Sequence, residues 1–199
     1  METVYSLSFP EPDINKREIM RYMSSLGGGD EIIELIDECL AEARATLQYK
    51  VCYAVLSAET NGDTIALPCG QIESKNLARN LSGCDKAIVF AATIGVGIDR
   101  LISKYSRLSP TKALCFQAIG AERVEALCDE FCEKMKSEYE KNGERLKPRF
   151  SPGYGDLPLA TQKMIFALLD CPKRIGVTLG DTLLMSPSKS VTAFVGIPE

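Results

Sequence analysis

Apolar positions recur at helical spacing along several stretches of the chain. The longest stretch runs from Pro110 to about Asn142, and its apolar stripe comprises Ala121, Val124, Cys128, Phe131, Met135 and Tyr139. Ser109 suits the N-cap, Pro110 suits the first turn, and Gly143 can end the helix. The pattern therefore predicts one long amphipathic helix. Shorter helices are predicted over residues 14–26, 31–48, 72–84, 96–109 and 159–170.

Two aspartates are expected to cap the first two helices. Asp13 precedes the first helical pattern and Asp30 precedes the second. Between them, Gly27, Gly28 and Gly29 are expected to end the first helix, since glycine is a poor helix former.

Strand-like patterns alternate with these helices. Residues 50–60 are rich in β-formers, and Asn61-Gly62 gives a hairpin turn signal before a second β-rich run. Residues 85–95 are almost continuously apolar, which indicates a central strand covered on both faces. Short strands are predicted over 174–179 and 190–196. The order predicts an α+β fold over 1–199, a single domain with a mixed or antiparallel sheet and several helices.

Composition excludes several partners. The chain has 199 residues and a net charge of −4, so it offers no attraction to nucleic acid or to an anionic membrane surface. No apolar run is long enough to span a bilayer, and the first residues lack the pattern of a signal peptide. We therefore expect a cytoplasmic protein that acts without nucleic acid or membrane.

The absence of histidine restricts the chemistry further. Without histidine there is no Ser-His-Asp or Cys-His catalysis and no imidazole metal ligand. Eight cysteines lie mostly within apolar patterns. Cys128 and Cys132 share a helix face and could supply part of a metal site, but the interpretation as small core residues is favoured. Any chemistry must then depend on positioning, or on carboxylates, Lys, Tyr or Cys.

The stretch RFSPGYGDLP, residues 149–158, is the main candidate site. Its prolines and glycines disfavour both helix and strand. Arg149 can pair with a ligand carboxylate, Pro152-Gly153 allow a close backbone approach, and Tyr154 adds a ring with a polar tip. These features suit an amino-acid-like ligand. The residues alone favour a surface arginine before a type II turn, since Pro-Gly turns are common.

A second candidate is the run of charged residues on the long helix: Glu122, Arg123, Glu125, Asp129, Glu130 and Glu133. Paired carboxylates can perform acid–base work or face a cationic ligand. More often such a run is a solvated face.

Residues 149–196 carry a characteristic series of residues: Arg149, Pro152, Gly153 and Tyr154, then Ile175, Gly176 and Leu179, then Met185, Pro187, Ser190 and Val191. With this series the segment resembles the C-terminal activation domain of cobalamin-dependent methionine synthase. The resemblance extends over about 84–196, is most specific over 149–191, and is loose over 1–83.

The resemblance implies an S-adenosylmethionine site. Arg149 would hold the ligand carboxylate, Pro152 and Gly153 would give backbone contact, and Tyr154 would flank the ligand on the corrinoid-facing side. The family uses an acidic residue on the long helix, for which Glu125 is the nearest candidate and Glu122 the second.

The resemblance also implies a role as a reactivation subunit. The cobalamin would be held by a partner, either a cobalamin-dependent methionine synthase lacking its own activation domain or another corrinoid protein. An electron from a flavodoxin-like or other donor would reduce cob(II)alamin to cob(I)alamin, which takes the sulfonium methyl. This methyl transfer needs positioning rather than a general base.

The sequence departs from a complete methionine synthase. It has no Asp-x-His-x-x-Gly corrinoid signature, and we expect neither a zinc site nor the family's further C-terminal segment, since the chain ends at Glu199. Two alternatives stay open beside reactivation. One is a non-catalytic S-adenosylmethionine sensor or assembly protein, and the other is an independent methyltransferase with another acceptor.

Overall fold

A four-stranded antiparallel sheet forms the centre of the computed structural model, which describes residues 2–24, 29–141 and 143–198. Its strand order is β1-β2-β6-β9, built from β1 (Val4–Phe9), β2 (Tyr49–Ser57), β6 (Cys84–Thr93) and β9 (Ser190–Pro198). The α+β fold with an antiparallel sheet is confirmed. The first helix ends at Tyr22, so the prediction that Gly27, Gly28 and Gly29 end it was wrong, and Gly27 and Gly28 themselves lie outside the described residues. The long helix ends at Glu140, close to the predicted end near Asn142, a residue that also lies outside the described residues.

The apolar run of β6 occupies the middle of this sheet. Residues 87–93 of β6 are buried throughout, and the strand pairs with β2 on one side and β9 on the other. A strand covered on both faces has no reason to alternate apolar and polar residues. The expectation of a doubly covered central strand is confirmed.

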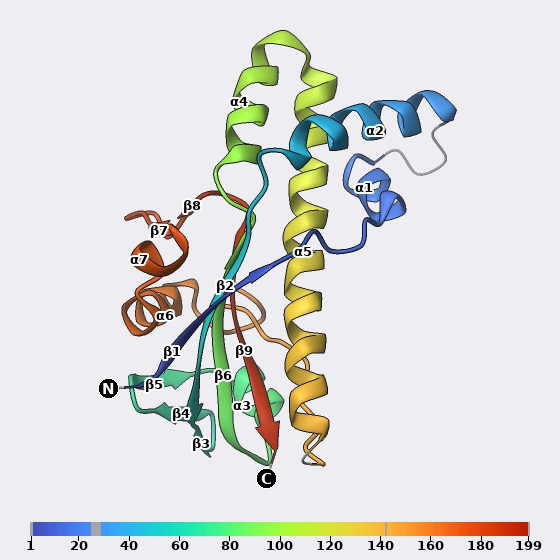
Figure 1. The fold of residues 1–199 in the computed structure, drawn as a ribbon. Coiled ribbons are helices and arrows are strands. Elements are labelled where there is room, and N and C mark those ends of the chain that lie inside the picture. The colour runs from blue at the N-terminus through green and yellow to red at the C-terminus, as the bar shows by residue number, and fades with distance from the viewer. Residues whose placement is uncertain (1, 25–28, 142, 199) are drawn as a thin grey trace.

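One face of the sheet is covered by the long helix α5 (Pro110–Glu140), which runs along the sheet in Figure 1. The helices α4 (Gly97–Leu108), α2 (Asp30–Arg44) and α1 (Lys16–Tyr22) pack beside α5. Ser109 caps α5 as predicted, since its hydroxyl accepts a hydrogen bond from the Lys112 N–H. Phe131 of α5 packs against Phe90 of β6 with ring centroids 4.7 Å apart, so aromatic contacts join helix and sheet.

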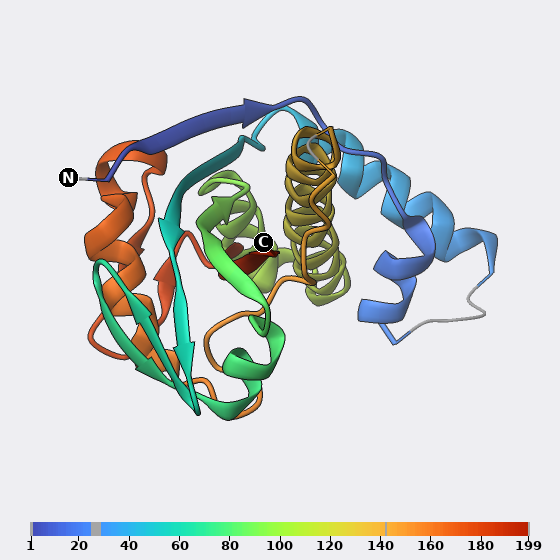
Figure 2. The ribbon, with the colours of Figure 1, turned by 90° about the horizontal axis from the view of Figure 1, so that it is seen from below.

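The opposite face carries smaller elements, which Figure 2 shows on the far side of the sheet from α5. These are α3 (Lys75–Asn80), the 3₁₀ turn η1 (Leu159–Thr161), α6 (Gln162–Leu169), α7 (Cys171–Ile175), and two small sheets made of β3 (Glu59–Asn61), β4 (Thr64–Leu67), β5 (Gly70–Glu73) and of β7 (Thr178–Leu179), β8 (Met185–Ser186). The predicted hairpin turn at Asn61-Gly62 joins β3 to β4. Within the described residues, no helix is both long and apolar enough to cross a membrane.

Three further local predictions were wrong. Asn15, not Asp13, caps α1 with its side chain, because the Asp13 carbonyl is held by Arg123 before the helix begins. Asp30 is the first residue of α2 rather than its cap. The strand expected over 174–179 is shorter, since Pro172 starts α7 and Gly176 ends it in a left-handed conformation. Strand β1 was not predicted at all.

Candidate functional site

The loop of residues 149–158 connects the segment after α5 to α6, and its ends are fixed. Phe150 exchanges both backbone hydrogen bonds with Phe194 of β9, at 2.8 Å each. Further along, the Gly153 N–H donates to the Leu157 carbonyl at 2.9 Å, and the Leu157 side chain is buried. The prediction of a shaped loop here is confirmed.

Pro152 explains why the loop leaves the sheet. Antiparallel pairing of Phe150 with Phe194 would next set residue 152 opposite Thr192. Proline has no N–H to donate, so the ladder cannot continue at that position. Gly153 then takes φ +87°, a conformation that side chains with a Cβ rarely adopt, and turns the chain away from β9.

Asp156 fixes the far side of the loop to α3. Its carboxylate accepts hydrogen bonds from the Ser74 hydroxyl at 2.5 Å and from the Lys75 and Asn76 N–H groups at 2.9 and 3.2 Å. The Ser74 hydrogen bond, aided by these N–H groups, lowers the pKa of Asp156 below its ordinary value. The loop is therefore held between β9 and α3.

Arg149 reaches back to the long helix. Its Nη2 atom pairs with the Glu125 carboxylate and lies 3.4 Å from Oδ1 of Asp129. Only 25% of the Arg149 side chain is exposed. Burial alone lowers the pKa of Arg149, but the net shift is upward because Cys128 and Glu125 raise it. The guanidinium is thus a fixed positive charge in a half-buried setting.

A pocket of about 450 Å³ lies beside this ion pair, at the β9 edge of the sheet. Its lining includes four of the five predicted site residues, namely Glu125, Arg149, Pro152 and Tyr154. The fifth, Gly153, sits in the same loop between two of them. The structure therefore brings the predicted residues together, from α5 on one face and the loop at the edge.

Tyr154 stands at the mouth of the pocket. Its side chain is 73% exposed, and its ring meets the edge of Phe150 with centroids 5.9 Å apart and planes at 89°. An exposed aromatic ring held in one orientation is suited to contact a ligand or a partner surface.

Two lining residues were missed from the sequence, Gln162 of α6 and Thr192 of β9. They are 4% and 2% exposed, and neither Gln162 Oε1 nor Thr192 Oγ1 has a hydrogen-bond partner. Leaving such an atom buried and unpaired costs about 1–3 kcal/mol. The sequence could have pointed to Gln162, because it is a polar residue at the helical spacing of the buried residues Ile165, Phe166 and Leu169. Thr192 gave none, because threonine is an ordinary strand residue.

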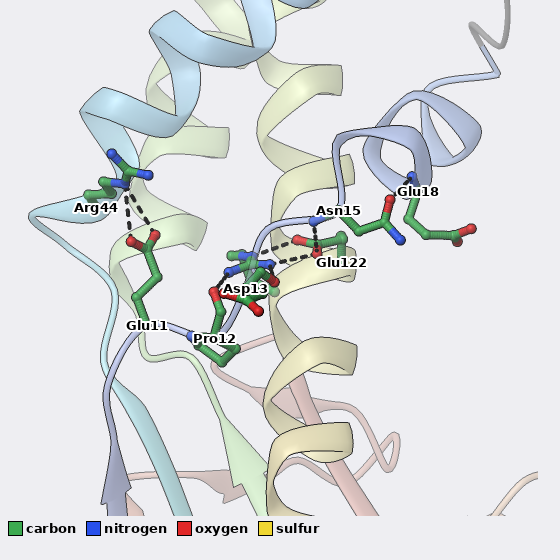
Figure 3. A network of polar contacts seen from close by, with 8 residues as sticks. Glu11, Pro12, Asp13, Asn15, Glu18, Arg44 and Glu122 are labelled. Carbon is green, nitrogen blue, oxygen red and sulfur yellow. Dashed lines mark hydrogen bonds and ion pairs between the residues drawn. The ribbon is translucent and has the colours of Figure 1, made fainter.

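Glu122, the second acidic candidate, is buried and paired, so it is less available to a ligand than Glu125. Glu122 and Arg123 form a buried pair with Arg123 Nε 2.5 Å from Glu122 Oε2. The guanidinium also donates to the carbonyls of Pro12 and Asp13 at 2.6 Å each, and Glu122 accepts from the Asn15 N–H at 2.9 Å (Figure 3). The pair therefore holds the segment that leads into α1 against α5. The solvated face predicted for these two residues is replaced by a structural contact.

A larger hollow of about 700 Å³ lies between α1 and α5 and meets the first pocket at Glu125. Its lining is dominated by acidic side chains, among them Glu18, Asp129, Glu130 and Glu133. Carboxylates alone repel an anionic group. The smaller pocket is the better candidate, since it combines a cation, a carboxylate, a ring and neutral polar groups.

Comparison with known proteins agrees with this architecture. The family model described as "Vitamin B12 dependent methionine synthase, activation domain" matches residues 72–197. Among solved structures, the chain is similar to one described as "Crystal Structure of the MetH Reactivation Domain bound to AdoHcy", with a TM-score of 0.68 and 17% identity over 98% of this chain and 78% of that chain. No curated protein matches the chain.

The two matches carry different weight. At this level of identity the structural likeness shows the fold alone, whereas the family match spans more than half of the chain and contains the whole Arg149 loop. The chain therefore belongs to the family of vitamin B12-dependent methionine synthase activation domains.

Proposed function

We propose that this protein is a stand-alone S-adenosylmethionine-binding reactivation subunit of a cobalamin-dependent methionine synthase, or of a related corrinoid methyltransferase. The observation that carries the proposal is the juxtaposition of Arg149 and Glu125 beside a pocket with an exposed tyrosine at its mouth. The similar MetH domain binds AdoHcy, the product that S-adenosylmethionine leaves after giving up its methyl group.

The pocket suits the amino-acid end of this ligand. Arg149 contacts carboxylates through Nη2, so Nε and Nη1 each keep an N–H that would donate a charge-assisted hydrogen bond to the ligand carboxylate. Glu125 supplies the counter-charge for the ligand ammonium. The chain's residues thereby hold and orient the ligand, and no proton has to be moved by them.

The corrinoid is held by the partner in this proposal. The chemistry supplied when both are bound is one-electron reduction of the partner's cob(II)alamin, followed by transfer of the sulfonium methyl to cobalt with release of S-adenosylhomocysteine. The electron comes from a flavodoxin-like or other donor, and the setting is the cytoplasm. Tyr154, at the exposed mouth, flanks the ligand on the side that the partner approaches.

Calorimetric titration with S-adenosylmethionine tests the binding step. Arg149→Ala should lose about 1.5–3 kcal/mol of binding free energy, the typical value for a charge-assisted hydrogen bond. Arg145→Ala, an exposed arginine four residues earlier, is the control and should bind as the wild type does. Unchanged binding by Arg149→Ala would refute the site.

A second measurement tests the reactivation step. The protein is mixed with a methionine synthase lacking its activation domain, S-adenosylmethionine and a one-electron donor, and recovery of turnover is followed. Recovery that needs all three additions supports reactivation. Ligand binding without recovery with any corrinoid protein would favour the sensor instead.

A further inference from the structure

The pocket lining includes neutral polar groups that the proposed contacts to the amino-acid end of the ligand leave unused. Gln162 Oε1 and Thr192 Oγ1 are buried without a hydrogen-bond partner, and both residues line the Arg149 pocket. Buried polar atoms in folded proteins are nearly always paired. Two exceptions lining one pocket call for a common explanation.

The backbone of Thr192 adds to this set. Phe194 turns its N–H and C=O outward, away from β6, because it bonds Phe150 on that side. Outward-facing residues alternate along an antiparallel strand, so Thr192 faces the same way. The loop leaves the ladder at Pro152, and no backbone hydrogen bond joins Thr192 to the described part of the loop. The edge of β9 is thus open at the pocket.

The lining of the pocket combines charged and neutral groups. Arg149 pairs with Glu125 and lies near Asp129. Gln162, Thr192, Met185 and Val191 also line the pocket, and none of these four is ionisable. A ligand ammonium pairs more strongly with a carboxylate than with a neutral amide oxygen. The neutral oxygens of Gln162 and Thr192 therefore suit uncharged N–H and O–H donors.

We propose that Gln162 and Thr192 form a nucleoside subsite, which binds the hydroxyl and amino donors of the adenosine half of the ligand. This inference rests on the proposed function and extends it to the half of the ligand that Arg149 and Glu125 do not contact. Both are positioning residues, since neither touches the methyl group that is transferred.

The test pairs two isosteric variants with two ligands. Thr192→Val and Gln162→Met remove the unpaired oxygens with little change in volume. S-adenosylhomocysteine carries both halves of the ligand, whereas methylthioadenosine lacks the amino-acid end. Each variant should bind both ligands about tenfold more weakly, as expected for the loss of one buried hydrogen bond. The matched controls Thr60→Val and Gln71→Met, both exposed in the small sheet, should leave both affinities unchanged.

Thermal melting of the free variants separates a binding role from a structural one. Removing an unpaired buried oxygen should leave the melting temperature equal to or above that of the wild type. Normal binding by both variants, a large drop in their melting temperatures, or weaker binding of S-adenosylhomocysteine alone would each overturn the subsite. Failure of the wild type to bind either ligand would overturn the proposed function itself, and the subsite with it.

Discussion

Arg149 contacts Glu125, on the helix 24 residues earlier, through one nitrogen only. That nitrogen, Nη2, is shared with Asp129, while Nε and Nη1 contact no carboxylate within the described residues. Arg149 is therefore held in one orientation but keeps N–H donors that contact no carboxylate of the described residues. Its remaining donors, at Nε and Nη1, lie on different edges of the guanidinium, and each can donate a hydrogen bond to a second carboxylate.

Glu125→Gln should weaken the binding of the ligand ammonium and leave the binding of the nucleoside half unchanged. The substitution keeps the shape of the side chain but removes the counter-charge for a ligand ammonium, so S-adenosylmethionine should bind about tenfold more weakly. Methylthioadenosine, which has no ammonium, should bind as before. Titration of both ligands gives the answer, and an equal loss for the two would place Glu125 at the nucleoside end instead.

Glu122→Ala should destabilise the fold rather than affect a site. The substitution leaves the Arg123 guanidinium buried, with 0% of its side chain exposed, and removes the carboxylate that neutralises it. Breaking such a pair typically costs about 3–5 kcal/mol in the free energy of unfolding. Urea denaturation measures this cost. Glu130→Ala, on the exposed side of the same helix, should change it by less than about 0.5 kcal/mol. A stable Glu122→Ala protein that failed to bind ligand would restore Glu122 as a site residue.

Asp156 should make the stability of the loop depend on pH in the acid range. Its pKa is lowered in the folded protein, so its contribution is present above the ordinary aspartate pKa and is lost as the pH falls through the folded value. Asp156→Asn should therefore melt below the wild type at pH 7, and the difference should vanish in strong acid. Asp181→Asn, exposed in the turn before β8, serves as the control. A difference that persisted in acid would mean that charge is unimportant at Asp156.

Gly153→Ala should weaken both the loop and ligand binding. At φ +87° an alanine is strained by about 1–2 kcal/mol, and its Cβ would lie 3.2 Å from Leu159 Cδ1. Gly62→Ala has a similar conformation, at φ +62°, but its Cβ would meet nothing within 4 Å. Both variants should lose stability, and only Gly153→Ala should lose affinity in the titration. Equal affinities would show that the backbone at Gly153 lies away from the ligand.

The sequence predicted those elements whose pattern is local. The stripe of α5, the cap at Ser109 and the apolar run of β6 each follow from a few neighbouring residues, and each is confirmed. The residues of the Arg149 loop were likewise visible, because their prolines and glycines exclude helix and strand. What failed depended on distant partners. Strand β1 is held by pairing with β2, at least 40 residues away in the chain.

The roles of charged residues also depend on distant partners that the sequence does not reveal. Glu122 and Glu125 are three residues apart on one helix and look equivalent in the sequence. The chain that passes over Glu122 brings the carbonyls of Pro12 and Asp13, which fix Arg123 beside it. Glu125 pairs with Arg149 instead. Only the tertiary structure distinguishes Glu122, which belongs to a buried ion pair, from Glu125, which is a candidate to contact the ligand.

The place of β9 in the site has a consequence for biosynthesis. This strand supplies one wall of the pocket, yet it is made after α5, the Arg149 loop and α6 have left the ribosome. A nascent chain that stops short of β9 holds every charged group of the site and still lacks the wall that carries Thr192. At the proposed site, ligand would therefore bind only chains that have completed the sheet, and its binding free energy would add to the stability of those chains alone.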